Sequence, residues 1–98
     1  MIENFADDAS KDIFDGTNST AARNLLPQNL WTVARRKLDM LDAAAELKDL
    51  GSVLGNRLEK LKGALKDRYS IRINDQYRIV FKFEDGKANE VQITDHYR

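Results

Sequence analysis

Residues 69–81 read YSIRINDQYRIVF, and this stretch decides the fold. On both sides of its centre apolar residues alternate with polar ones, as in a strand with one face in a core. The centre itself, residues 74–76, is Asn-Asp-Gln, which favours a tight turn. We therefore predict a hairpin of two antiparallel strands.

The register of this hairpin follows from its apolar residues, which must share one face. A three-residue loop pairs Ile71 with Ile79 and sets Arg72 opposite Arg78 on the other face. Like charges directly opposite each other cost up to about 1 kcal/mol. The pair is easier to understand if that face binds an anion.

A third strand follows. Residues 91–94, VQIT, alternate in the same way, and the sequence EDGK before them supplies a turn. The same parity pairs Ile79 with Ile93 and Phe81 with Val91.

One face of the predicted sheet therefore collects cationic residues. Arg78 lies opposite Thr94 and diagonal to His96, which shares the face of Arg72 and Arg78 by strict alternation. Lys62 and its basic neighbours lie on the approach. The simpler alternative is a set of solvated surface residues.

The first half of the chain predicts helices. Apolar residues recur at spacings of three and four across residues 30–45, which places them on one helical face. This stripe, which we expect in the core, consists of Trp31, Ala34, Leu38, Leu41 and Ala45. Pro27 suits the first turn of this helix. We also expect short strands at 1–5 and 58–61, short helices at 9–15 and 46–50, and a loop at 17–23.

Helices followed by strands predict an α+β fold, with N-terminal helices packed on one face of a small, mainly antiparallel β-sheet. Ninety-eight residues suit a single domain spanning residues 1–98. The chain contains no Cys and one His, so disulfides, thiolate metal sites and multi-His metal sites are excluded. We expect neither a metal nor a cofactor.

No apolar run approaches the roughly 18 residues that a membrane span needs. The acidic N-terminus also lacks the pattern of a signal peptide. These features predict a cytoplasmic protein without a membrane partner.

The charges are unevenly distributed, although the formal net charge is zero. Residues 1–20 hold five carboxylates and one lysine, a net charge of −4, whereas residues 57–72 hold six basic and two acidic residues, a net charge of +4. The first segment repels phosphate and the second attracts it. Two solvated surface patches are the alternative interpretation.

Several motifs resemble a known group of toxins. Residues 61–81 resemble the RelE superfamily: a Leu-x-Gly turn, a strand with an arginine, a tight turn, and a strand that begins with an aromatic residue and an arginine. The HigB branch of that superfamily is similar to RKLDMLDAA at 36–44, GNRLEKLKG at 55–63 and ITDHY at 93–97. The resemblance covers residues 30–97, and residues 1–29 only loosely.

HigB toxins are ribosome-dependent messenger-RNA endonucleases that a HigA antitoxin of the helix-turn-helix type neutralises. The resemblance thus implies a HigA-like antitoxin, and the ribosomal A site with its messenger RNA, as partners. By position it selects as catalytic residues Lys62, Arg78, Asp95, His96 and Tyr97. Further basic residues would contact ribosomal RNA through its phosphates: Arg57, Lys60, Lys66, Arg68 and Arg72.

These residue types suit metal-free RNA cleavage, in which the ribose 2′-OH attacks the adjacent phosphorus. The step needs a base, an acid and cations around the phosphorane. His96 has a side chain that titrates near neutrality. Arg78 and Lys62 could stabilise the added charge, Tyr97 could stack on a base or transfer a proton, and Asp95 could orient a neighbour.

The chain departs from the HigB pattern in two places. Its terminus runs Asp-His-Tyr where the branch runs Asp-Tyr-His, so either His96 or Tyr97 could transfer the proton. Glu59 stands where some relatives have a His. Two other functions stay open: a non-catalytic ParE-like toxin that acts on DNA gyrase, and an inactive relative that only binds an antitoxin. The terminal cluster and the Lys62-Gly63 match speak against the ParE-like alternative.

Overall fold

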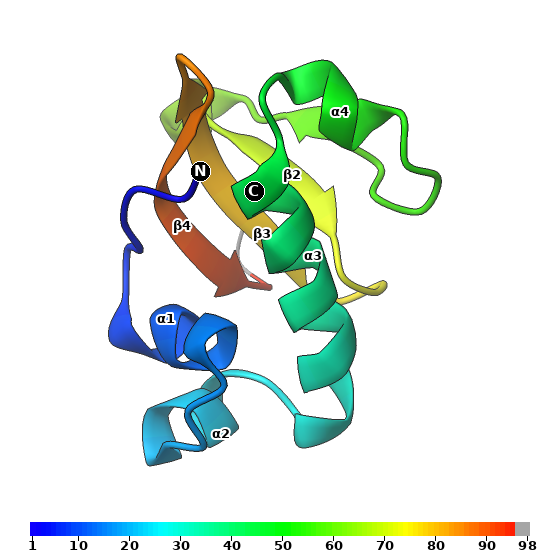
Figure 1. Cartoon of the computed structure of the whole chain (residues 1–98). Helices are drawn as coiled ribbons and strands as arrows, with labels where there is room; N and C mark the ends of the chain where they lie inside the picture. Colours follow the sequence, from blue (N-terminus) through cyan, green and yellow to red (C-terminus); the bar gives the residue numbers. More distant parts are fainter. Residues whose placement is uncertain (96–98) are drawn as a thin grey trace.

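The structure, a computed structural model, describes residues 1–95 (Figure 1). Its helices are α1 (Asp8–Asp15), α2 (Thr20–Leu25), α3 (Trp31–Ala43) and α4 (Leu47–Gly51), with two short 3-10 helices, η1 (Gln28–Leu30) and η2 (Gly63–Leu65). Its strands are β1 (Glu59–Lys60), β2 (Tyr69–Arg72), β3 (Arg78–Glu84) and β4 (Lys87–Thr94).

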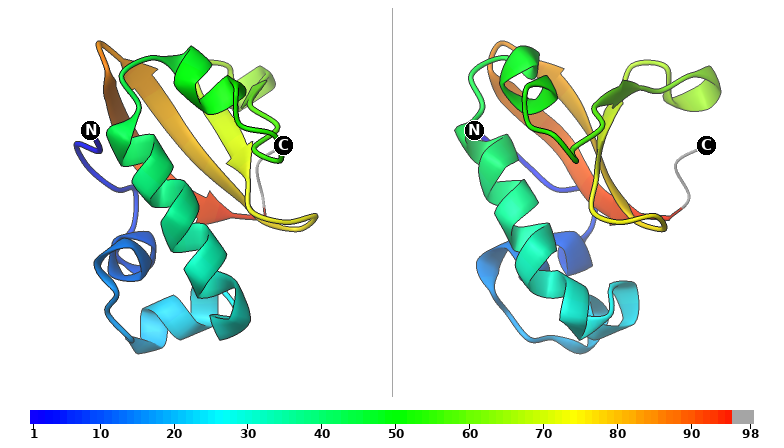
Figure 2. Two further views of the ribbon diagram at one scale, coloured as in Figure 1. Left: turned by 45° about the vertical axis from the view of Figure 1, so that its right-hand side comes forward. Right: turned by 90° about the vertical axis from the view of Figure 1, so that its right-hand side faces the viewer.

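The four strands form one antiparallel sheet in the order β1-β2-β3-β4. Helices α1, α2 and α3 gather on one side of this sheet (Figures 1 and 2). The main core lies between them, where side chains of α3 meet the inward residues of β2, β3 and β4. The predicted α+β class and the predicted strand at 58–61 are both confirmed.

The central hairpin has the predicted register. Ile71 lies opposite Ile79, and Arg72 lies opposite Arg78. The turn between them is closed by the side chain of Asn74, which accepts hydrogen bonds from the backbone N–H groups of Gln76 and Tyr77 at 2.9 and 2.8 Å. An Asn side chain that bonds to its own turn is the reason this residue type favours turns.

The second hairpin pairs Ile79 with Ile93, as predicted, but its register then shifts by one residue between Val80 and Lys82. Strict alternation, which also pairs Phe81 with Val91, did not include this shift. Glu90 lies at the shift with a φ of 50°, a left-handed conformation that is typical of a β-bulge. Alternation along the strand could not reveal this, because the bulge is fixed by Asn4, whose side chain accepts from the Glu90 N–H at 2.6 Å.

The long helix buries most of the predicted stripe. Leu38 and Leu41 are fully buried, but the helix ends at Ala43. Ala45 therefore lies beyond the helix and is exposed, and Ala44 is buried in its place. The prediction for Ala45 was wrong because the helical spacing was extended past the last turn.

The predicted loop at 17–23 was also wrong, since α2 occupies most of it. Ser19 caps this helix by accepting a hydrogen bond from the Ala22 N–H at 3.0 Å. Its six residues are too few to show a helical period, whereas its Ser cap is an ordinary helix start signal.

Residues 1–5 lie beside β4, as expected of an edge strand. Their pairing is limited to two isolated parallel bridges, Ile2 with Ala88 and Phe5 with Val91. The N-terminal segment therefore covers the β4 edge, and an exposed edge is a common site of unwanted strand pairing.

Candidate functional site

The candidate site lies on the outer face of the sheet, by which we mean the face turned away from α3. Ser70 of β2 and Arg78 and Lys82 of β3 have side chains on this face by alternation along their strands. The segment that contains η2 lies on the same side of the sheet (Figure 2).

Arg78 is almost completely buried, with 5 % of its surface exposed. Its Nε donates to Ser70 Oγ at 2.8 Å, and its Nη2 donates to the carbonyl oxygens of Arg57 and of Ser70, the latter at 3.3 Å. Arg72 pairs instead with Asp75. The like charges of Arg72 and Arg78 are thus each held by acceptors of the protein itself. From the sequence, we had explained these facing like charges by a bound anion.

The Arg57 carbonyl, which accepts from Arg78, belongs to a strained backbone segment. Arg57 has a φ of 45°, in the left-handed region that non-glycine residues seldom adopt. The preceding carbonyl, that of Asn56, accepts from the Arg72 N–H at 2.6 Å. Residues 56 and 57 are therefore anchored to the end of β2 and present a carbonyl to Arg78.

Sequence reasoning missed Lys37 and Asn56, which are both buried. The Lys37 Nζ donates to Asn56 Oδ1. A signal for this contact existed, because Lys37 occupies a core-facing position between Ala34 and Leu41, at the spacing of the apolar stripe.

Three lysines surround a surface hollow of about 360 Å³ beside β1 and η2, which we call the lysine hollow. It is lined by Lys60, Leu61, Lys62, Gly63 and Lys66. The three lysines are exposed, and none of them forms an ion pair within residues 1–95. A hollow with three available ammonium groups is suited to phosphate oxygens.

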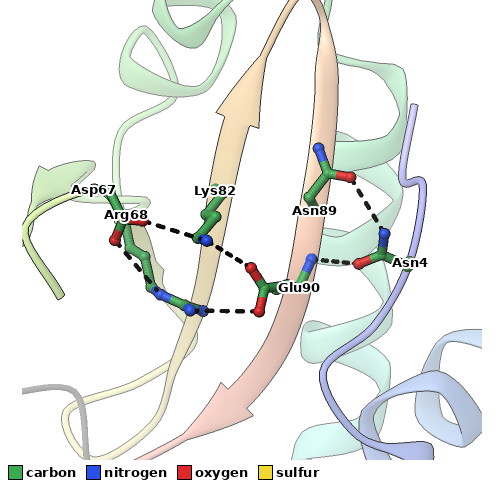
Figure 3. Close-up of polar contacts among 6 residues, drawn as sticks. All are labelled: Asn4, Asp67, Arg68, Lys82, Asn89 and Glu90. Carbon is green, nitrogen blue, oxygen red and sulfur yellow. Dashed lines mark hydrogen bonds and ion pairs between the residues drawn. The ribbon is translucent and has the colours of Figure 1, made fainter.

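Other cations of the outer face are paired in a closed ring of charges (Figure 3). Lys82 Nζ lies 2.7 Å from Glu90 and 3.3 Å from Asp67, and Arg68 lies 3.5 Å from Glu90 and 3.8 Å from Asp67. We call these four residues the ion-pair ring. Only 17 % of the Arg68 side chain is exposed, so its charge is compensated and partly covered.

The ring shifts the pKa values of its members. A hydrogen bond from Lys82 and the charges of Lys82 and Arg68 lower the pKa of Glu90. Hydrogen bonds to Glu90 and Asp67 raise the pKa of Lys82. Desolvation acts to raise the pKa of Asp67, but the hydrogen bond and charge of Lys82 outweigh it and lower that pKa. All three shifts favour the ionised state.

The terminal cluster is described only in part. Asp95 is exposed, and its Oδ2 accepts from Gln76 Nε2 at 3.5 Å. It follows Thr94, which lies opposite Arg78. His96 and Tyr97 lie outside the described residues. The structure thus places Asp95 one residue beyond the strand position that faces Arg78.

Comparison with known proteins identifies the family of this chain. Residues 3–96 match the family described as RelE-like toxin of type II toxin-antitoxin system HigB. The chain belongs to this family of HigB-like toxins. The resemblance drawn from the sequence motifs is therefore confirmed, and the match extends into the N-terminal segment, where that resemblance was loose.

Two relatives are similar over most of their length. Toxin HigB-1 of Vibrio cholerae serotype O1 is 43 % identical over 72 residues, which cover 74 % of this chain and 76 % of the relative. An uncharacterized protein of Haemophilus influenzae is 41 % identical over 71 residues, covering 72 % and 70 %. As a toxin of a type II system, this HigB-like toxin has an antitoxin as its partner.

The acidic N-terminal segment of this HigB-like toxin has structural contacts of its own. Asp7 caps α1 by accepting from the Ser10 N–H at 2.7 Å, and Asp15 pairs with Lys11 at 2.6 Å. That hydrogen bond and the Asp15 charge raise the pKa of Lys11. Some of the carboxylates that give this region its predicted negative charge therefore stabilise α1.

Two further observations concern residues 1–95 alone. They contain no helix that is long and apolar enough to cross a membrane. They also contain no group of three or more His, Cys, Asp or Glu side chains arranged to hold a metal ion.

Proposed function

We propose that this HigB-like toxin is a ribosome-dependent endonuclease that cuts messenger RNA and thereby stops translation. The observation that carries the proposal is the lysine hollow. The hollow is lined in part by the segment that contains η2, and this segment lies on the side of the sheet that also carries Arg78. Arg78 lies opposite Thr94, which Asp95 follows. The family, whose members are typically endoribonucleases of this kind, supports the same reading.

The lysines make the first contacts in this account. Lys60, Lys62 and Lys66 are exposed and can reach RNA phosphates, whereas Arg78 is nearly buried. Phosphate contacts of this kind hold RNA without reading its sequence. They dock the toxin on ribosomal RNA, together with Arg57 and Arg72, while Lys62 also faces the message.

Arg78 stabilises the transition state. Its guanidinium is held by Ser70 and by the Arg57 carbonyl before any RNA arrives. A cation that is fixed in advance needs no reorganisation when charge develops on the phosphorane oxygens. This is the reason a largely buried arginine suits the role.

The proton transfers fall to the terminal cluster. A base removes the 2′-OH proton as the O2′–P bond forms, the P–O5′ bond breaks, and an acid protonates the leaving O5′. The products are a 2′,3′-cyclic phosphate and a free 5′-OH. We assign these transfers to His96 or Tyr97, with Asp95 orienting its neighbours.

The proposal places the protein in the cytoplasm, where messages are translated in the ribosomal A site. A HigA-like antitoxin of the helix-turn-helix type is the partner that would restrain it.

Induction of the toxin without its antitoxin tests the proposal. We expect growth arrest and cuts inside a translated reporter message, and no cuts in the same message without its ribosome-binding site. Equal cutting of both messages would contradict ribosome dependence. Intact messages combined with disturbed DNA supercoiling would favour the ParE-like alternative instead.

A further inference from the structure

Lys37 is a lysine in an unusual place. It projects from the core-facing side of α3, and 9 % of its surface is exposed. Burial and the nearby charges of Arg36 and Arg72 lower its pKa. Within residues 1–95 no carboxylate pairs with its ammonium group. A buried ammonium without a counterion is costly, so simple packing would be served better by Leu or Met.

The ammonium group of Lys37 donates to the side chain of Asn56, which is fully buried. Asn56 Nδ2 in turn donates to the Leu50 carbonyl at 3.1 Å, and the Asn56 carbonyl accepts from the Arg72 N–H at 2.6 Å. One residue thus connects α3, the end of α4 and the end of β2. Lys37 supplies the only one of these links that involves a charged group.

The next carbonyl along the chain is the one that holds Arg78. Arg57 follows Asn56 directly, has a φ of 45°, and accepts from Arg78 Nη2. A left-handed non-glycine residue persists only when its surroundings hold it in place. The contacts that hold Asn56 therefore also hold the Arg57 carbonyl against Arg78.

We infer that Lys37 is a positioning residue for the cleavage reaction. Through Asn56 it fixes the Arg57 carbonyl. This carbonyl in turn sets the orientation of the Arg78 guanidinium on the outer face of the sheet. The inference rests on the proposed function, because it matters only if Arg78 acts on the scissile phosphate. Lys37 itself does not touch RNA in this arrangement.

The test compares Lys37→Met with Lys48→Met in the full-length toxin. Lys48 lies on α4 with an exposed side chain, which makes it a matched control for removal of an ammonium group. On programmed ribosomes we expect Lys37→Met to lower kcat about 10–100-fold with KM for ribosomes unchanged, since a small misplacement of a catalytic group has effects of this size. Lys48→Met should leave both constants unchanged.

A double-mutant cycle separates positioning from general destabilisation. In an Arg78→Ala background Lys37→Met should lower kcat no further, because the group it positions is gone. Equal losses in both backgrounds would overturn the inference. Normal cleavage by Lys37→Met, with Arg78→Ala inactive, would overturn it while leaving the proposed function intact. If Arg78→Ala itself cleaves normally, Arg78 does not stabilise the transition state, and that part of the proposed function is wrong.

A measurement without ribosomes keeps the inference testable on its own. The Arg78 Nε–H donates to Ser70 Oγ, so its NMR resonance reports the guanidinium position. In Lys37→Met this resonance should shift or broaden while amides of the β3–β4 hairpin stay in place. An unchanged resonance would contradict the inference. If Lys37→Met does not fold, Lys37→Gln, which keeps an N–H donor, replaces it in both experiments, with a smaller expected loss.

Discussion

The lysine hollow and the ion-pair ring both include residues of the basic segment 57–72, yet the cations of the hollow are exposed and those of the ring are paired. Lys60, Lys62 and Lys66 are exposed and form no ion pair within the described residues. Arg68 and Lys82 are each paired with the same two carboxylates, those of Asp67 and Glu90. The difference shows that a positive stretch of sequence contains two kinds of cation, one available to phosphate and one used to join strands.

The two arginines that face each other across the hairpin also differ in the partners that hold them. Arg72 pairs with Asp75 at the turn, whereas Arg78 is directed into backbone and hydroxyl acceptors. Neutral acceptors orient a guanidinium without cancelling its charge. The acceptors of Arg78 thus fix the position of its guanidinium, and Arg78 is the more deeply buried of the two arginines.

The largest effect is expected from Arg78→Ala. Cleavage on ribosomes should slow about 10²–10³-fold, or roughly 3 kcal/mol, as for other lost oxyanion donors. Single-turnover cleavage rates of the folded variant measure this. Lys82→Ala is the matched control, because Lys82 lies on the same strand and face but is already neutralised. Its rate should stay within about threefold of the unmodified toxin, since exposed ion pairs contribute little. Equal losses in both variants would show that Arg78 contributes no more to cleavage than another cation of the same face.

A second effect concerns docking. Replacement of Lys60, Lys62 and Lys66 together by Gln should weaken ribosome binding about 10²-fold at moderate salt and reduce the salt dependence by roughly 2–3 in log-log slope, because three phosphate contacts are lost. Arg68→Gln should change affinity only a few-fold, since its charge is compensated. Co-sedimentation with ribosomes over a salt series measures both.

The folding of the triple variant should be nearly unchanged, because its three side chains are exposed. A normal circular dichroism spectrum with lost binding supports the account. If Arg68→Gln weakened binding as much as the triple variant, the ring would have to open and contribute to docking.

The smallest effect concerns stability in acid. Glu90 has a folded pKa below its ordinary value of 4.5, so the unfolded chain takes up its proton first and stability falls as pH drops below that value. Glu90→Gln should be slightly less stable at neutral pH and lose less on acidification. Thermal midpoints between pH 7 and pH 3 measure this, and Lys82→Met should reduce the same pH dependence. An unchanged acid profile in both variants would show that the ring adds no stability.

The sequence predicted the hairpin well because its register depends on local rules. Alternating apolar residues and an Asn-containing turn were sufficient to pair Ile71 with Ile79 and Arg72 with Arg78. The bulge at Glu90 escaped prediction because it depends on Asn4, which lies at the other end of the chain. Alternation carries no information about such a distant partner.

The arrangement of the candidate site could not be predicted from the sequence, and its residues stay a prediction. Motif resemblance selected Lys62 and Arg78, yet the burial of Arg78 and the pairing of Arg68 follow from contacts between distant segments. Lys37 was overlooked although it interrupts an apolar stripe. A polar residue at a core position of a helix is a signal that sequence reasoning could have used.

The chemistry at the ends of the cut RNA tests the central claim most directly. A purified message, either free or bound in translating ribosomes, is incubated with the toxin, and the fragment ends are identified. The account predicts cuts only on the ribosome, with a 2′,3′-cyclic phosphate or the phosphate derived from it upstream and a 5′-OH downstream. Cuts of the free message at the same rate, or fragments that end in a 3′-OH and a 5′-phosphate, would contradict it.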